Sequence, residues 1–219
     1  MADLAVYAAD IGSIKSDHFG WAGVEGGSCE ITAKGKKIDA LVDSIASDLQ
    51  RRPVALGFEC PLWIPVHADS SILGSARPGE GKHPWSAGAG AAVMASGLVQ
   101  ITWILDQLRL KLPKLKAHTD WRGFRRASGQ LFLWEAFVAG SAKDASDLSK
   151  DMDPDVRDAI IAATAFAADC KKGPPPGTVE PGEGTGAISI VGAALLHAGL
   201  VDDLSILRRH CHVLKVGAK

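Results

Sequence analysis

Two apolar runs that each end on a carboxylate constrain the fold most. The first, VYAADIGS at residues 6–13, ends on Asp10, and the second, VALGFECPLW at residues 54–63, carries Glu59. Apolar runs of this length between Gly, Ser or Pro are typical of strands buried in a sheet. Asp and Glu are rarely buried unless they are paired or bound to a metal, because burying a lone charge is costly. Each acid therefore needs a partner or an ion.

The first third of the chain predicts a strand meander. Residues 4–12 read as a strand that ends at Gly12-Ser13. Residues 18–27 and 29–35 read as two shorter strands, and the Gly26-Gly27 pair between them is a hairpin signal. Residues 53–61 form a continuous apolar run between prolines, which suits a central strand covered on both faces.

Helical patterns alternate with the later strands. Apolar residues at helical spacing predict a helix over 37–52, and a long helix is expected over 90–112, before Pro113. Asp153 as N-cap and Pro154 at the first helical position predict a third helix over 153–172. The remaining expected elements are a strand at 130–140, a short helix at 187–198 and a last strand at 206–216.

This order predicts an α/β fold with a mixed sheet flanked by helices. A chain of 219 residues suits a single domain over residues 1–219. Residues 62–90 are rich in Pro, Gly and Ser and too long for a simple connection, so we expect an inserted functional loop or lid. Residues 178–219 then form a helix–strand extension at the C-terminus.

Composition excludes several function classes. The net charge of −1 gives no overall attraction to nucleic acid or membrane, so any nucleic-acid contact needs a local basic patch. We find no signal peptide and no uninterrupted apolar run that would span a membrane, and we expect a cytoplasmic protein without membrane contact. The four cysteines form no CxxC pair and read as reduced thiols, and the HCH segment at 210–212 reads as an edge-strand polar face. The sequence leaves open whether the protein forms a homodimer.

Five acids interrupt the hydrophobic pattern in or near predicted strands and one helix. They are Asp10, Glu59, Glu135, Asp155 and Asp158. Asp155 and Asp158 are three residues apart on a helix and point to roughly the same side. Such acids would repel one another unless a divalent cation neutralised them, and Mg²⁺ prefers carboxylate, water and phosphate oxygens. Two such ions about 4 Å apart activate water for phosphodiester cleavage.

Each acid also has an ordinary explanation. Asp10 precedes Gly12-Ser13 and suits a turn. Glu135 suits the outward face of a half-exposed strand, and Asp155 suits the first turn of a helix. The set and its order along the chain carry the metal hypothesis, rather than any single acid.

Several segments resemble ribonuclease H-like nucleases. VYAADIGS resembles their first catalytic strand, and an acid on the first strand, Glu on the fourth and Asp-x-x-Asp on a late helix resembles the Holliday-junction resolvase branch. GFECPLWIP, LFLWEAFVAG and VRDAIIAATAFA are similar to segments of an uncharacterised family of predicted ribonuclease H-like nucleases. The resemblance covers about residues 4–170 and implies a ribonuclease H-like fold.

The resemblance also implies a site and an activity. Asp10, Glu59 and Asp158 would bind Mg²⁺ or Mn²⁺, with Glu135 or Asp155 completing a nuclease site. Two departures stand out. The family usually has Asp where Glu59 stands, and its Cys-Glu segment appears here only as RPGEG, with Glu80.

The nucleic-acid candidate is the basic segment 109–126, where Trp121 and Phe124 are interleaved. Basic side chains neutralise phosphates and aromatic rings stack on bases. The residues chosen for this role are Lys114, Lys116, Arg122, Arg125 and Arg126. A solvated helix end and linker explains the segment equally well. DNA and RNA are not distinguished.

Two other functions stay open at this point. The same fold serves as a non-catalytic binding module, and actin-like nucleotide- or phosphate-binding proteins share a related strand order. Actin-like proteins need two such domains and a second phosphate loop, for which this chain has no room.

Overall fold

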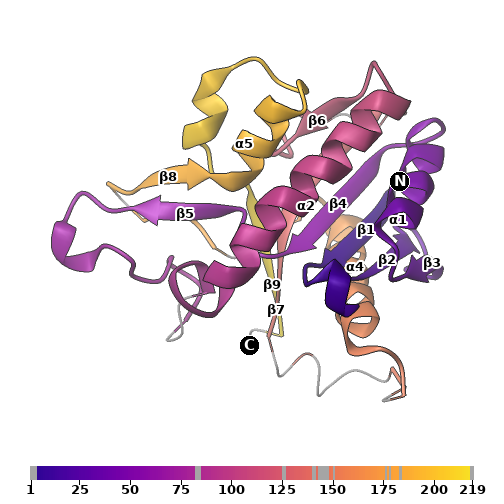
Figure 1. The fold of residues 1–219 in the computed structure, drawn as a ribbon, viewed down its shortest axis with the longest axis horizontal. Helices are drawn as coiled ribbons and strands as arrows, with labels where there is room; N and C mark the ends of the chain where they lie inside the picture. Colours follow the sequence, from indigo (N-terminus) through magenta and orange to yellow (C-terminus); the bar gives the residue numbers. More distant parts are fainter. Residues whose placement is uncertain are drawn as a thin grey trace.

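The computed structural model describes residues 4–81, 85–124, 127–139, 142, 148–149, 151–175, 177, 179–182 and 184–217. A seven-stranded sheet forms its centre, in the order β3-β2-β1-β4-β7-β6, with β9 also pairing with β7 (Figure 1). Its strands are β1 (Ala5–Asp10), β2 (Gly20–Glu25), β3 (Ile31–Gly35), β4 (Val54–Glu59), β6 (Lys116–His118), β7 (Gln130–Val138) and β9 (His212–Val216).

The sheet is antiparallel at its start and parallel in the rest. β1, β2 and β3 form the antiparallel meander, whereas β4 runs parallel to β1 and β7 runs parallel to β4, β6 and β9. This is the ribonuclease H-like topology, so the predicted fold class is confirmed. Because β1 and β4 are parallel, their C-terminal residues meet at one end of the sheet.

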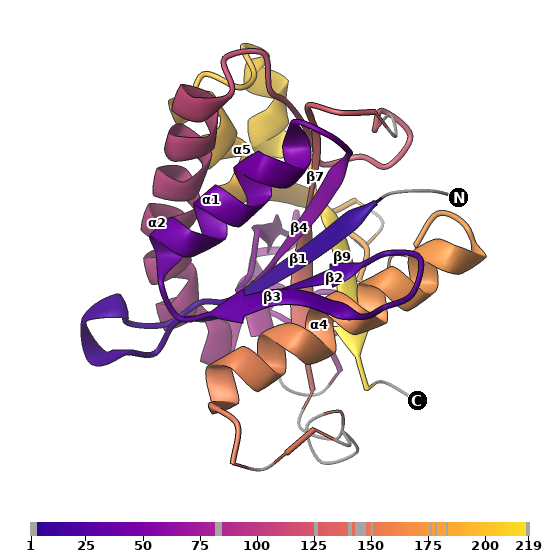
Figure 2. The same cartoon turned by 90° about the vertical axis from the view of Figure 1, so that its right-hand side faces the viewer.

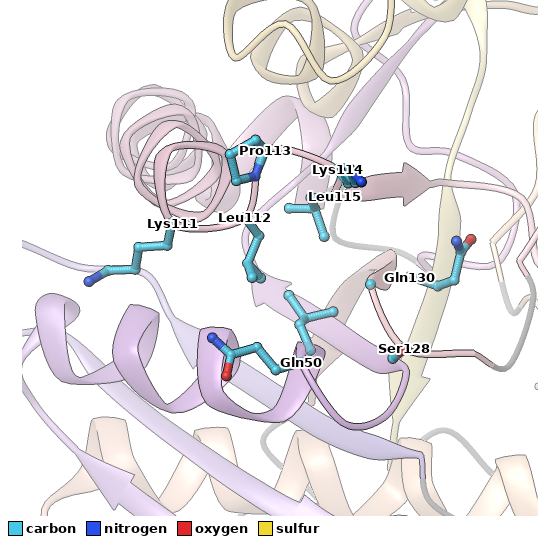
Figure 3. A pocket seen from close by; sticks show the side chains of 10 residues that line it. Gln50, Lys111, Leu112, Pro113, Lys114, Leu115, Ser128 and Gln130 are labelled. Atoms are coloured by element: carbon cyan, nitrogen blue, oxygen red, sulfur yellow. The ribbon is translucent and has the colours of Figure 1, made fainter.

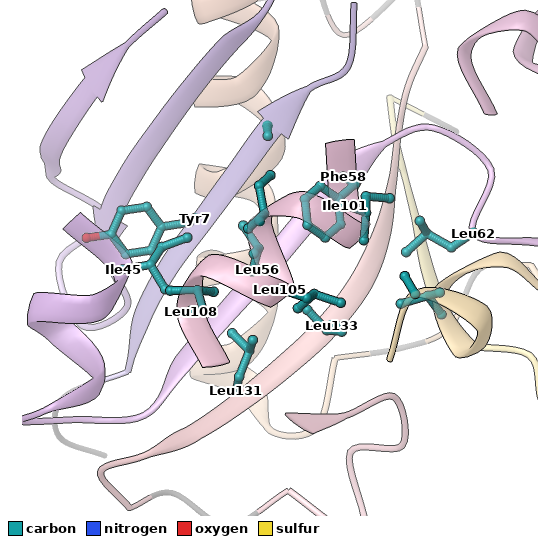
Figure 4. Packing of buried hydrophobic residues seen from close by; sticks show 14 of the residues in the cluster. Tyr7, Ile45, Leu56, Phe58, Leu62, Ile101, Leu105, Leu108, Leu131 and Leu133 are labelled. Carbon is teal, nitrogen blue, oxygen red and sulfur yellow. The ribbon is translucent and has the colours of Figure 1, made fainter. Parts of the chain in front are cut away.

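Helices cover both faces of the sheet (Figure 2). On one face lie α1 (Ile38–Leu49) and α2 (Gly90–Lys111), and on the other lies α4 (Pro154–Lys172). Strand side chains alternate between the two faces. Leu56 and Phe58 of β4 pack with Ile101 and Leu105 of α2 in the first core (Figure 4), while Ala55 joins the core under α4.

The core under α4 depends on one glycine. Trp134 of β7 stacks on Phe166 of α4, with ring centroids 4.1 Å apart. A Cβ at Gly57 of β4 would lie 2.4 Å from the Trp134 ring, so only glycine leaves room for the indole.

Helix α2 meets the length and hydropathy of a membrane span, at 22 residues and a mean hydropathy of 1.3. Its Ile101, Ile104, Leu105 and Leu108 are buried in the core that covers the sheet. One face of α2 therefore belongs to the core, and the absence of membrane contact stays a prediction.

Four segments differ from the sequence prediction. The expected loop 62–90 contains β5 (Trp63–Val66), which pairs with β8 (Gly186–Ser189). This pairing takes the first residues of the predicted helix 187–198, so α5 spans only Ile190–His197. The predicted last strand begins later, because residues Leu204–Arg208 form a 3₁₀ helix before β9. The basic segment 109–126 contributes the short strand β6. It is stabilised by pairing with β7, and its own sequence pattern did not predict it.

Candidate metal centre

Asp10 and Glu59 lie side by side at one end of the sheet. They are directly paired residues at the C-terminal ends of the parallel strands β1 and β4. By strand alternation both point to the face that α4 covers, like Val6, Ala8 and Ala55. The two acids that end the apolar runs are therefore neighbours, as the sequence predicts.

Helix α4 brings the third acid to the same place. Asp153 caps α4 by accepting hydrogen bonds from the backbone N–H groups of Asp155 and Val156. The first turn lies directly on β2, because a Cβ at Gly20 would come within 2.3 Å of the Asp155 backbone. Asp158, one turn further, is thereby held against the sheet end.

The three carboxylates form one cluster. Single oxygens of Asp10, Glu59 and Asp158 all lie within 4.8 Å of one another. Glu59 and Asp158 are only 7% and 5% exposed, whereas Asp10 is half-buried, so the cluster is reached from the end of the sheet. Oxygens on opposite sides of one octahedral Mg²⁺ are about 4.2 Å apart, which lies within this upper limit. The all-oxygen donor set fits Mg²⁺ or Mn²⁺ rather than a metal that prefers nitrogen or sulfur.

Glu135 lies on the other face of the sheet. It shares the α2 face with Leu131 and Leu133 and is fully buried. Arg77 donates two hydrogen bonds to its carboxylate, one of them 2.8 Å long, and the Leu62 N–H donates a third. Burial raises the pKa of Glu135, and the Arg77 charge opposes the rise. The structure therefore gives Glu135 a cationic partner instead of a place among the three clustered acids.

Arg77 and Glu80 anchor the long loop in the core, which sequence reasoning missed. Both side chains are fully buried and pair at 2.6 Å. Glu80 also accepts hydrogen bonds from the backbone N–H groups of Trp85 and Ser86, and the Arg77 guanidinium lies 4.6 Å from the Trp63 ring centroid. The RPGEG segment that contains both residues was the available signal, since an Arg and a Glu three residues apart can pair. This part of the loop is a fixed structural unit.

Asp155 lies beside the cluster but outside the group of three. Its carboxylate is 3.8 Å from Lys36 Nζ and 3.7 Å from His18 Nδ1. Burial, followed by the nearby Asp153 carboxylate, raises the pKa of Asp155. Its role in holding a metal stays a prediction.

Two of the predicted nucleic-acid residues, Lys114 and Lys116, lie apart from the acids. Lys116 pairs with Gln130 at the start of β7, so Lys114 and Lys116 lie at the opposite end of the parallel strands from Glu59. Lys114 lines a hollow of about 450 Å³ between the ends of α1 and α2 (Figure 3). Arg122 lies in the turn after β6, whereas Arg125 and Arg126 lie outside the described residues.

Comparisons of the chain with family models, with curated proteins and with solved structures find no match. The topology and the acidic cluster are therefore the observations from which function is argued.

Proposed function

We propose that this protein is a Mg²⁺- or Mn²⁺-dependent hydrolase of phosphodiester bonds in nucleic acid. The convergence of Asp10, Glu59 and Asp158 carries the proposal. These acids come from a first strand, a fourth strand and a late helix, which is the order expected from the resemblance to ribonuclease H-like nucleases. That resemblance, and not the geometry, supplies the choice of nucleic acid as substrate.

The chain's own residues would hold and orient the reacting groups. A bound divalent cation supplies charge neutralisation at the phosphate and an activated water. Glu59 and Asp158 are buried acids on rigid elements, so their oxygens would approach the ion from fixed directions. Asp10 is half-buried, so a substrate phosphodiester would approach the site from the side of this residue.

Cleavage assays on labelled single-stranded, duplex and junction DNA and on RNA test the proposal. Activity should require Mg²⁺ or Mn²⁺ and stop in EDTA. Asp10→Asn and Glu59→Gln should each reduce cleavage at least ~100-fold, while Asp43→Asn, an exposed acid on α1, should retain wild-type activity.

Two outcomes would contradict the proposal. Full activity in both variants would show that Asp10 and Glu59 are not part of the active site. Metal binding at the cluster without cleavage of any of these substrates would instead favour a non-catalytic binding module.

A further inference from the structure

Two segments that the sequence analysis treated separately meet in one pocket. The turn after β6 contributes Asp120, Trp121 and Arg122, and the chain entering β9 contributes the residues from Arg208 to His212. The pocket has a volume of about 570 Å³ and lies where β6 ends and β9 begins, both beside β7. We call it the basic pocket.

Cations outnumber acids in the basic pocket. Arg122, Arg208 and Arg209 line it together with Asp120 and Glu180, and His210 adds a further positive charge when it is protonated. Asp203, which pairs with Arg209 from outside the lining, brings the neighbouring acids to three, so an anion would be held by the guanidinium donors of this concave site rather than by an excess of positive charge. Arginine donors are suited to phosphate oxygens because the guanidinium presents paired N–H groups.

The ion pairs within the pocket are weak enough to exchange. Arg122 pairs with Asp120 at 3.1 Å, yet its side chain is 92% exposed. Glu180 pairs with His210 at 3.3 Å, and Arg209 pairs with Asp203, which is outside the pocket lining. Exposed pairs of this kind contribute about 0–1 kcal/mol, so a phosphate can replace the carboxylate partner of an arginine.

The pocket has an aromatic wall of fixed position. The Trp121 ring lies 4.9 Å from Phe132 and 5.2 Å from Phe124. His212 lies 5.9 Å from Phe166, and burial lowers its pKa to about 4, so it is neutral at pH 7. A half-buried indole beside arginines suits a ligand that joins a phosphate to a flat base.

We propose that the basic pocket binds a phosphate group, either of a single nucleic-acid strand or of a free nucleotide. The site does not require the metal centre. It assigns a role to Arg208, Arg209 and His210, which the sequence analysis left outside the nucleic-acid segment.

Binding assays in EDTA test the pocket separately from metal-dependent cleavage. Fluorescence anisotropy with a labelled 12-nucleotide single-stranded DNA measures binding of a nucleic-acid strand. Calorimetry with a nucleoside monophosphate measures binding of a free nucleotide. An Arg122→Gln/Arg208→Gln double variant should weaken binding about tenfold and reduce the salt slope for the strand by about 1.4. Lys34→Gln, an exposed basic residue on the far edge strand β3, should bind within twofold of wild type.

The outcomes assign or reject the site. Loss of strand binding in the double variant assigns the pocket to nucleic acid, and loss of monophosphate binding alone assigns it to a nucleotide. The proposal is overturned if the wild-type protein binds neither ligand, or if the double variant, shown to be folded by circular dichroism, binds as tightly as wild type. An Asp10→Asn variant should keep this binding even if the proposed hydrolase function fails.

Discussion

Asp10 and Glu59 are directly paired residues on the parallel strands β1 and β4 and point to the same face of the sheet. Neighbouring strands are about 4.8 Å apart, so the two carboxylates are held together by the backbone itself. Asp158 joins them from α4. Carboxylates this close repel one another by charge, and a divalent cation bound between them would reduce that repulsion.

Removing one acid should therefore stabilise the metal-free protein. Asp10→Asn should melt at an equal or higher temperature than wild type in EDTA, because one repulsive charge is lost. At 100 times Kd, Mg²⁺ should stabilise wild type by about 2.7 kcal/mol and so raise its melting temperature, and it should have little effect on the variant. Thermal melts with and without Mg²⁺ measure both effects. Equal Mg²⁺ stabilisation of the two proteins would place the ion elsewhere.

Glu135→Gln should have the opposite effect on stability. The change leaves the buried Arg77 charge without its full partner, and breaking a buried pair costs about 3–5 kcal/mol. Urea unfolding of the two proteins measures this loss. Mg²⁺ affinity of the folded variant should stay within a few-fold of wild type. Unchanged stability with lost metal affinity would instead place Glu135 in the metal centre.

Gly20→Ala should disturb the metal centre without removing a ligand. The new methyl group would overlap the Asp155 backbone and push the start of α4, and with it Asp158, away from the sheet. We expect at least tenfold weaker Mn²⁺ binding by calorimetry. Gly27→Ala is the matched control, since nothing lies within 4 Å of its added Cβ. Equal Mn²⁺ affinity of both variants would show that the position of α4 does not control the site.

Stability should fall in acid through His212. Its folded pKa is about 4 against an ordinary 6.5, because burial disfavours the charged ring. Between these pH values the unfolded chain therefore binds a proton that the folded protein does not. The stability that depends on a neutral His212 ring is fully present above pH 6.5 and is lost as the pH falls toward 4. The full effect is about 3 kcal/mol.

Urea unfolding from pH 4 to 7 measures this dependence as the difference between wild type and His212→Gln. The slopes of unfolding free energy against pH should differ between the two proteins mainly from pH 4 to 6.5. Parallel curves for wild type and His212→Gln would contradict the account.

Local pattern was enough to predict most elements that position the acids. Asp10 and Glu59 stand at the ends of uniformly apolar runs, and Asp153 with Pro154 marks the start of α4, so these elements could be recognised without tertiary information. The strands β5, β6 and β8 were missed because each is short and is stabilised by a distant partner, as in the pairing of Trp63 with Ser189.

Glu135 shows what local pattern could not supply. Alternation places Glu135 on one face with Leu131 and Leu133, but it does not say which helix covers that face. Its partner Arg77 comes from a Pro- and Gly-rich segment whose composition is typical of an exposed loop. Burial of the Arg77 side chain arises from contacts with Trp63 of β5 and Glu135 of β7, which no spacing in the sequence encodes.

Diffraction from crystals soaked in Mn²⁺, with the ion located by its anomalous signal, shows whether the three acids bind a cation. We expect an ion coordinated by side-chain oxygens of Asp10, Glu59 and Asp158. Crystals in millimolar Mn²⁺ that show no ion at these three carboxylates, or an ion only at other residues, would contradict the proposed metal centre.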